Sequence, residues 1–256
     1  MIVDPRITAV AAQWEPLALQ PLRVTLRLAS PLGGSEPLHL DGLLAQAMVA
    51  HATQGQGLEP STEPYWQPLP LRCLWRDPQR DLPLWASTSF LPVGLTHADV
   101  STWTRQDMPP ALVHRSRRND VYAPRRTQGP EKRQGVALPT VLADAWTADA
   151  IGDMAVIMAL LRTFSHVGKK RSQGYGVVAT WDIHPIPTFR LTDESGRLRR
   201  PVPGRALVDW GAPIAVPESF FSASMLGWTP PYWHLGSMAS SIPAGVELPI
   251  PPEVLT

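Results

Sequence analysis

The sequence contains little cysteine, little lysine and no long hydrophobic run. A single cysteine, Cys73, excludes an internal disulfide and a zinc site built from several cysteines, so we expect a small buried apolar side chain there. The longest unbroken apolar run, Met154 to Leu161, is far shorter than the roughly 20 residues that span a bilayer. No signal-peptide pattern opens the chain. We therefore expect a cytoplasmic protein without a membrane partner.

Net charge is also nearly absent. The 23 Lys and Arg residues and 22 Asp and Glu residues leave a formal net charge of +1, so bulk charge does not predict a nucleic-acid-binding protein. The 256 residues are 44% hydrophobic, which indicates a globular chain with a buried core. Prolines number 29 and predict long irregular connections, because proline fixes φ and interrupts strand ladders.

The positive charge is nevertheless concentrated, and most of it is arginine. Three stretches, 115–133, 162–171 and 190–205, hold 16 of the 23 basic residues. The first stretch is the densest and contains Arg115, Arg117, Arg118, Arg125, Arg126, Lys132 and Arg133. Such clusters attract phosphates even in a near-neutral protein, although most charge runs are solvated loops.

Hydrophobic periodicity predicts an α+β fold. Residues 1–20 read as a leading arm or extra edge strand. Strands are predicted at 22–29, 71–75, 84–90 and 176–183, helices at 40–51 and 149–166, and a hairpin at 189–202. The order strand, helix, strand, strand, helix, strand is that of the ferredoxin-like (RRM-like) unit, whose two helices cover one face of an antiparallel sheet. RNA-binding proteins often use the open face of such a sheet.

The domain boundaries follow from the same pattern. Residues 1–203 are expected to form the ferredoxin-like domain, with a basic insertion at about 92–139 where the pattern is weak. Residues 204–256 read as an irregular, proline-rich extension that packs on this domain. Its aromatic residues between Phe220 and Trp233 suit either packing against the protein's own sheet or contacts with bases or a protein partner.

The segment between the second predicted helix and the last strand carries the chemistry. Its glycines let the main chain turn tightly and approach a ligand, and its side chains offer cations, neutral donors and one ring. In order, the residues are Gly168, Lys169, Lys170, Arg171, Ser172, Gln173, Gly174, Tyr175 and Gly176. The segment follows a helix, so it is neither a P-loop nor a dinucleotide fingerprint. A helix C-cap explains only Gly168 and part of the role of Lys169.

This glycine-rich loop resembles that of the RAMP superfamily of CRISPR RNA-binding proteins. Residues 24–31 and 38–45 also look like the first strand and first helix of that family. Together with the hairpin segment 196–203, they most resemble the Cas-five-type subunit of type IV CRISPR complexes. The resemblance covers about residues 22–205.

The resemblance implies a non-catalytic subunit that binds the 5′ handle of the CRISPR RNA and caps the backbone of a type IV effector complex. It makes the 92–139 insertion a thumb. RNA-binding residues would be Gly168 to Tyr175 in the loop, Arg115, Arg117, Arg118, Arg125 and Arg126 in the thumb, and Arg27 and His39. Partners would be the CRISPR RNA, backbone RAMP subunits, a large subunit and target DNA.

Two other function classes stay open. A metal-independent RAMP endoribonuclease that processes repeat RNA would need a general acid, a general base and a cation, which His39, His166, Tyr175 and Lys169 supply if they converge. A protein-interaction scaffold would use its arginines on acidic partners. A metal site is not expected because His39 and Asp41 have no evident third ligand, and the sequence contains no cofactor motif or nucleophile elbow.

Overall fold

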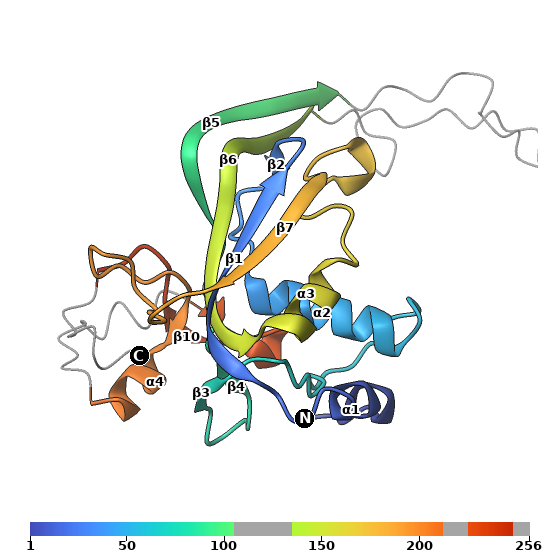
Figure 1. Ribbon diagram of the computed structural model, residues 1–256, viewed down its shortest axis with the longest axis vertical. Coiled ribbons are helices and arrows are strands. Elements are labelled where there is room, and N and C mark those ends of the chain that lie inside the picture. Colours follow the sequence, from blue (N-terminus) through green and yellow to red (C-terminus); the bar gives the residue numbers. More distant parts are fainter. Residues whose placement is uncertain (105–134, 212–224, 248–256) are drawn as a thin grey trace, which may run out of the picture.

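The protein is a mixed α/β structure with antiparallel sheets, described here from a computed structural model (Figure 1). The structure describes residues 1–104, 135–211 and 225–247. Within these ranges, no helix is both long and apolar enough to cross a membrane.

The main sheet is organised around its longest strand. Its strands are β1 (Leu19–Leu28), β2 (Leu32–Gly33), β5 (Leu91–Thr104), β6 (Gly135–Asp153) and β7 (Val178–Pro185). β6 pairs with β1 and β2 along one edge and with β5 along the other, and β7 pairs with the free edge of β1. These pairings give the spatial order β5-β6-β1-β7. Every one of them is antiparallel.

Alternation along β1 determines which face of the sheet is covered. Leu22, Val24 and Leu26 are fully buried, and they pack in one core with the helices α1 (Pro5–Ala12), α2 (Leu40–Ala52) and α3 (Met154–Leu161). These helices lie on the same side of the sheet in Figure 1. Successive strand residues point to opposite faces, so the polar residues between those three side chains face the other side.

A second, smaller core lies on the opposite side of β6. Ala148 and Ala150 belong to the first core, whereas Ile151 packs in the second with Phe189 and Trp228. The elements around the second core are β3 (Cys73–Arg76), β4 (Pro83–Trp85), β8 (Val202–Pro203), α4 (Gly204–Asp209), β9 (Met225–Gly227) and β10 (Met238–Ile242). The described part of the 204–256 extension is thus more regular than expected.

Several predicted elements agree with the structure. The strand at 22–29 is β1, the helix at 40–51 is α2, and the strand at 176–183 is β7. The hairpin at 189–202 is reduced to one bridge between Thr192 and Leu198, with the expected turn at Gly196.

The predicted helix at 149–166 was wrong at both ends. Residues up to Asp153 belong to β6, and α3 occupies only Met154–Leu161. The side chain of Asp153 accepts hydrogen bonds from Ala155 N and Val156 N, both at 3.0 Å, and thereby caps the start of the helix. The end of the strand before it is buried on both faces and holds Ala148, Ala150 and Ile151, so its sequence resembles that of a buried helix.

The second and third strands of the predicted chain order were also assigned wrongly. The stretch 92–139, expected to be a basic insertion outside the sheet because its pattern is weak, begins and ends in the long strands β5 and β6. A register shift between Val93 and Thr96 breaks the alternation of β5, so the sequence pattern did not indicate a strand there. The predicted strands at 71–75 and 84–90 instead contribute to the separate β3–β4 pair.

Residues 1–20 hold a helix and not an arm or edge strand. The carboxylate of Asp4 accepts a hydrogen bond from Arg6 N at 2.9 Å, and Pro5 occupies the first turn of α1. Ile7 is fully buried against the first core.

Candidate nucleic-acid interface

The basic glycine loop, residues 168–176, connects α3 to β7 at one end of the main sheet. The turn between β1 and β2 and the described ends of β5 and β6 lie at the same end (Figure 1). Residues 168–174 are exposed, Tyr175 is half-buried and Gly176 is buried. The loop therefore presents its central residues to solvent while its base is packed.

Main-chain hydrogen bonds hold the basic glycine loop on the β1–β2 turn. Lys169 N donates to Gly33 O at 2.9 Å, and Gly176 N donates to Pro31 O at 2.9 Å. Across the base, Val167 N donates to Gly176 O at 2.8 Å. Since both flanks are anchored, the residues between them form a preorganised projection.

Two glycines permit this path of the chain. Gly168 has φ +80°, and a Cβ there would lie 2.6 Å from Leu32 Cδ1. Gly176 has φ +65°, and a Cβ there would collide with Val167 O. Larger residues would therefore suffer both backbone strain and steric overlap at these positions. Lys170 itself adopts the left-handed region with φ +59°.

The loop has three consecutive cations in different environments. Lys169 Nζ lies 2.8 Å from Glu36 Oε1 in an exposed ion pair. Lys170 and Arg171 are exposed, and the Arg171 guanidinium has no hydrogen bond or ion pair to the described residues. Such solvent-facing cations can contact an anionic ligand without first leaving a buried partner.

Arg27 and His39 are the two predicted site residues outside the loop and the insertion, and they differ in their exposure to solvent. Arg27 is exposed on the sheet face opposite the helices, where its Nη1 donates to Asp144 O at 3.3 Å. His39 is half-buried, with its ring 4.0 Å from the Tyr232 ring and its Nδ1 2.9 Å from Ser89 Oγ. Burial lowers the pKa of His39 to about 4. His39 is thus engaged by protein groups and lies less open to solvent than Arg27.

The predicted arginines of the insertion, Arg115, Arg117, Arg118, Arg125 and Arg126, lie outside the described residues, as do Lys132 and Arg133. The described strands on either side stop at Thr104 and resume at Gly135. Thr104 pairs with Gly135 at the end of the sheet where the basic glycine loop lies.

The third basic stretch, 190–205, does not present all its charge to solvent. Arg199 and Arg200 are buried, and Arg199 forms an ion pair with Asp149. Arg200 Nη2 donates to Asp41 Oδ2 and to Tyr232 OH, both at 2.9 Å. These two arginines therefore belong neither to a phosphate-attracting cluster nor to a solvated loop, because their guanidinium groups have buried carboxylate partners.

The buried pair gives Asp41 a role that sequence analysis missed. Asp41 lies in the first turn of α2, where a carboxylate favours the helix dipole, and the side chains of Asp41 and Arg200 are both only 1% exposed. The phenol of Tyr232 also donates to Asp41 Oδ1 at 2.8 Å, and burial raises the pKa of Tyr232. The cluster joins the C-terminal segments to the start of α2.

The open face of the main sheet offers no stacking platform between β1, β6 and β7. Leu26 pairs with Trp146 and Trp181, so both tryptophans lie on the helix-covered side. On the face opposite the helices, the side chains of this ladder beyond the second core are Arg23, Thr25, Arg27, Thr147, Asp149, Thr180, Asp182 and His184. Base stacking in the manner of aromatic RNA-binding sheets is therefore not supported here.

The two candidate histidines of the endoribonuclease alternative have different contacts. His166 Nδ1 is 3.0 Å from Ser165 Oγ, whereas the contacts of His39 are with Ser89 and Tyr232. Among the described residues, no three His, Cys, Asp or Glu side chains gather as a metal site. Burial raises the pKa of the half-buried Cys73 thiol.

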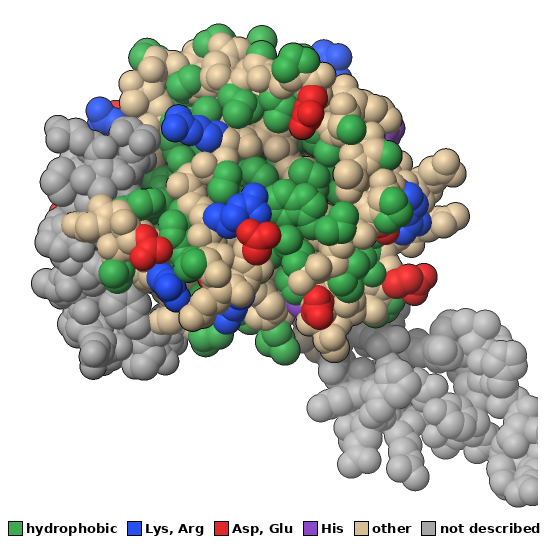
Figure 2. All heavy atoms as spheres, turned by 90° about the horizontal axis from the view of Figure 1, so that it is seen from below, with side chains coloured by type: hydrophobic (Ala, Val, Ile, Leu, Met, Phe, Trp, Pro, Cys, Tyr) green, Lys and Arg blue, Asp and Glu red, His purple; other side chains and the backbone are tan. Residues whose placement is uncertain are grey.

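The opposite end of the molecule lacks a face of single charge. Figure 2 views this end from below, and its described surface mixes hydrophobic side chains with Lys or Arg and Asp or Glu. In the aromatic tail, Trp228 is fully buried as expected for core packing, but Trp233 is 77% exposed.

Comparison with known families covers most of the chain. A family model described as CRISPR type IV associated protein Csf3 matches residues 20–242. This range begins in β1 and reaches the end of β10, so it includes the basic glycine loop. A search of curated proteins found no match.

Proposed function

Because the chain belongs to the Csf3 family of CRISPR type IV associated proteins, we propose that it is the subunit that binds the 5′ handle of the CRISPR RNA. The observation that carries this proposal is the exposed run Lys169–Arg171 on an anchored loop. Phosphate groups are the natural ligands of such cations.

The mode of binding follows from the surface around the loop. Arg27 and the three loop cations supply charge, and Ser172 and Gln173 supply neutral donors. Tyr175 is the one aromatic residue of the basic glycine loop itself, so among the described loop residues contacts to the sugar-phosphate backbone dominate over base readout. The basic residues 115–133 are proposed to extend the same RNA contact.

The finer fold assignment belongs to the same proposal. The order β5-β6-β1-β7 with α2 and α3 on one face supports a ferredoxin-like RAMP domain. In the assembled complex this subunit would cap the backbone formed by other RAMP subunits, contact a large subunit and lie near target DNA.

We further propose that the subunit is non-catalytic. A histidine with a pKa of about 4 is uncharged at neutral pH, so His39 would not serve as the general acid there, and its ring is engaged by Ser89 and Tyr232. His166 and Lys169 remain at the loop, without a second histidine among the contacts of either residue. Incubating purified protein with repeat RNA and EDTA tests this: specific cleavage would contradict the proposal.

The RNA-binding proposal is tested by changing Lys169, Lys170 and Arg171 together to Ala in the co-expressed complex. Retained CRISPR RNA is expected to fall, and the slope of log K against log salt is expected to decrease by about 0.7 for each lost single-strand phosphate contact. Circular dichroism of the variant checks that the fold is intact.

Two matched arginine variants separate the effect of a residue's position from the effect of losing one positive charge. Arg171→Ala removes an exposed arginine of the loop, and Arg205→Ala removes an exposed arginine of α4, at the other end of the molecule. Only the first is expected to weaken RNA retention. Equal effects, or an unchanged salt slope in the triple variant, would overturn the assignment of the loop as an RNA site.

A further inference from the structure

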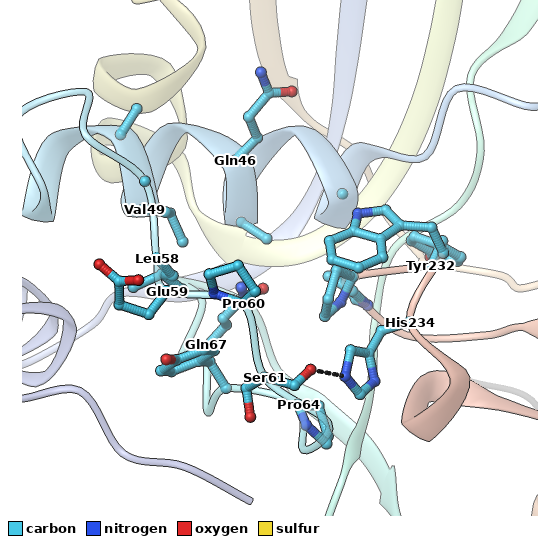
Figure 3. Close-up of a pocket in the computed structure, with 18 of the residues that line it drawn as sticks. Gln46, Val49, Leu58, Glu59, Pro60, Ser61, Pro64, Gln67, Tyr232 and His234 are labelled. Carbon is cyan, nitrogen blue, oxygen red and sulfur yellow. Dashed lines mark hydrogen bonds between the residues drawn. The ribbon is translucent and has the colours of Figure 1, made fainter.

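A cavity of about 610 Å³ lies away from the basic glycine loop, between three segments distant in sequence. One wall is α2, the second is the connection 55–67, and the third is the segment 230–234. Figure 3 shows Gln46 and Val49 of α2 above the cavity, with Leu58 and Pro60 on one side and Tyr232 and His234 on the other.

The cavity is lined mainly by prolines, aliphatic side chains and aromatic rings. Pro60, Pro64, Pro230 and Pro231 contribute four of its lining residues. Trp233 also lines it and is 77% exposed, which is unusual for so large an apolar side chain. Exposed tryptophan beside a hollow is typical of residues that anchor a protein partner.

The charge of the cavity excludes a nucleic-acid backbone as its ligand. No lysine or arginine is among its lining residues, whereas Glu59 and Glu63 are. Glu63 is paired with the amino terminus at 2.8 Å, and Glu59 is exposed. The guanidinium of Arg6, which is close enough to interact with Glu59, is held by Asp4 at 2.7 Å. A ligand with a cation is therefore favoured.

Two hydrogen bonds of His234 fix the cavity in its open shape. His234 Nδ1 accepts from Gly236 N at 2.9 Å, so Nε2 is the donor to Ser61 O at 3.2 Å (Figure 3). The buried ring therefore joins the second and third walls. A preformed site reduces the ordering cost of binding.

We propose that this cavity binds an extended, proline-containing segment of a partner protein that has Lys or Arg beside its apolar residues. Aromatic side chains and prolines form the grooves that accept such preformed segments, and acidic residues at the rim match the flanking cations. The charge complementarity separates this occupant from the RNA that the basic glycine loop is proposed to bind.

The test uses the full-length protein and overlapping fluorescent peptides that cover the other protein subunits of its type IV complex. Bound peptides are expected to combine proline or another apolar residue with Lys or Arg. Trp233→Ala is expected to weaken their binding about tenfold or more, as for a central anchor residue. Glu59→Lys, a second variant at an exposed position, is expected to weaken binding and to reduce its salt dependence.

Two controls make the result decisive. Leu235→Ala removes a side chain that is 81% exposed but does not line the cavity, and it is expected to leave peptide binding unchanged. The Lys169, Lys170 and Arg171 triple variant is also expected to bind the peptides normally, which separates this site from the RNA site. The proposal is overturned if no peptide binds, if Trp233→Ala has no effect, or if it alters only RNA retention or self-association.

Discussion

Lys169 Nζ and Glu36 Oε1 lie 2.8 Å apart, so the first cation of the basic glycine loop already has an anionic neighbour. The Lys169 side chain is 53% exposed and that of Glu36 74% exposed. An ion pair this open to solvent is weak and is screened by salt. An incoming phosphate must nevertheless compete with the carboxylate for the same ammonium group.

Glu36→Gln is therefore expected to strengthen RNA binding at low salt. The gain should be roughly two- to fivefold, the size of an exposed ion pair, and should fade as the salt concentration rises. Fluorescence anisotropy with labelled handle RNA measures it. Glu194→Gln, which removes an exposed acid elsewhere, serves as the control. Weaker binding by Glu36→Gln would show that the carboxylate supports the loop and does not compete with RNA.

The glycines of the loop are expected to differ in their tolerance of alanine. Gly174 has φ +85° but open space around its Cβ position, so Gly174→Ala should cost only about 1–2 kcal/mol of unfolding free energy. Gly176→Ala adds a collision with Val167 O and should cost more or prevent folding. Urea denaturation of both variants compares them. Equal costs would contradict the packed position of Gly176.

Sequence reasoning succeeded where an element has one buried face. β1 alternates cleanly, and α2 shows helical spacing, so both were predicted at nearly the right residues. It failed at the β6–α3 boundary because Ala148, Ala150 and Ile151 are buried in cores on opposite faces of the strand. An apolar run of this kind has no period that distinguishes strand from helix.

The candidate site shows the same division. The loop and its glycines were recognisable because turn chemistry is local, whereas the partner of a charge is not. Arg200 pairs with Asp41 across 159 residues of sequence, so no local pattern distinguishes it from a surface arginine. His39 similarly owes its depressed pKa to burial beside Tyr232, 193 positions away, a contact that only the tertiary structure brings about.

Stability is expected to depend on the protonation of His39. Its pKa is lowered from 6.5 to about 4 in the folded protein, so between these values the unfolded chain binds a proton that the folded chain does not. The stabilisation is present above pH 6.5 and is lost as the pH falls toward 4. Between pH 7.5 and pH 5 the loss should be about 2 kcal/mol.

The measurement is urea denaturation of the wild type and of His39→Gln at both pH values. The substitution should reduce the pH dependence across this window, whatever it does to absolute stability. His51→Gln, at an exposed position, should leave the dependence as it is. Asp149 does not contribute to the pH dependence of stability in this window. Its ion pairs outweigh desolvation and lower its pKa from 3.8, so its contribution to stability is lost only at more acidic pH. An unchanged slope in His39→Gln would show that His39 is not the group responsible.

The buried pair of Asp41 and Arg200 should tolerate joint removal better than the loss of one member. Asp41→Ala leaves a guanidinium in the core without its carboxylate, which should cost about 3–5 kcal/mol of unfolding free energy. The double variant Asp41→Ala, Arg200→Met removes both charges and should recover part of that loss, because desolvating an ion pair offsets much of its attraction. Chemical denaturation of both single variants and the double variant completes a double-mutant cycle. Asp81→Asn, which weakens the exposed pair with Arg76 at 3.0 Å, is the matched control and should change little. Strictly additive losses would mean that Asp41 and Arg200 are not energetically coupled, and that other contacts join the C-terminal segments to α2.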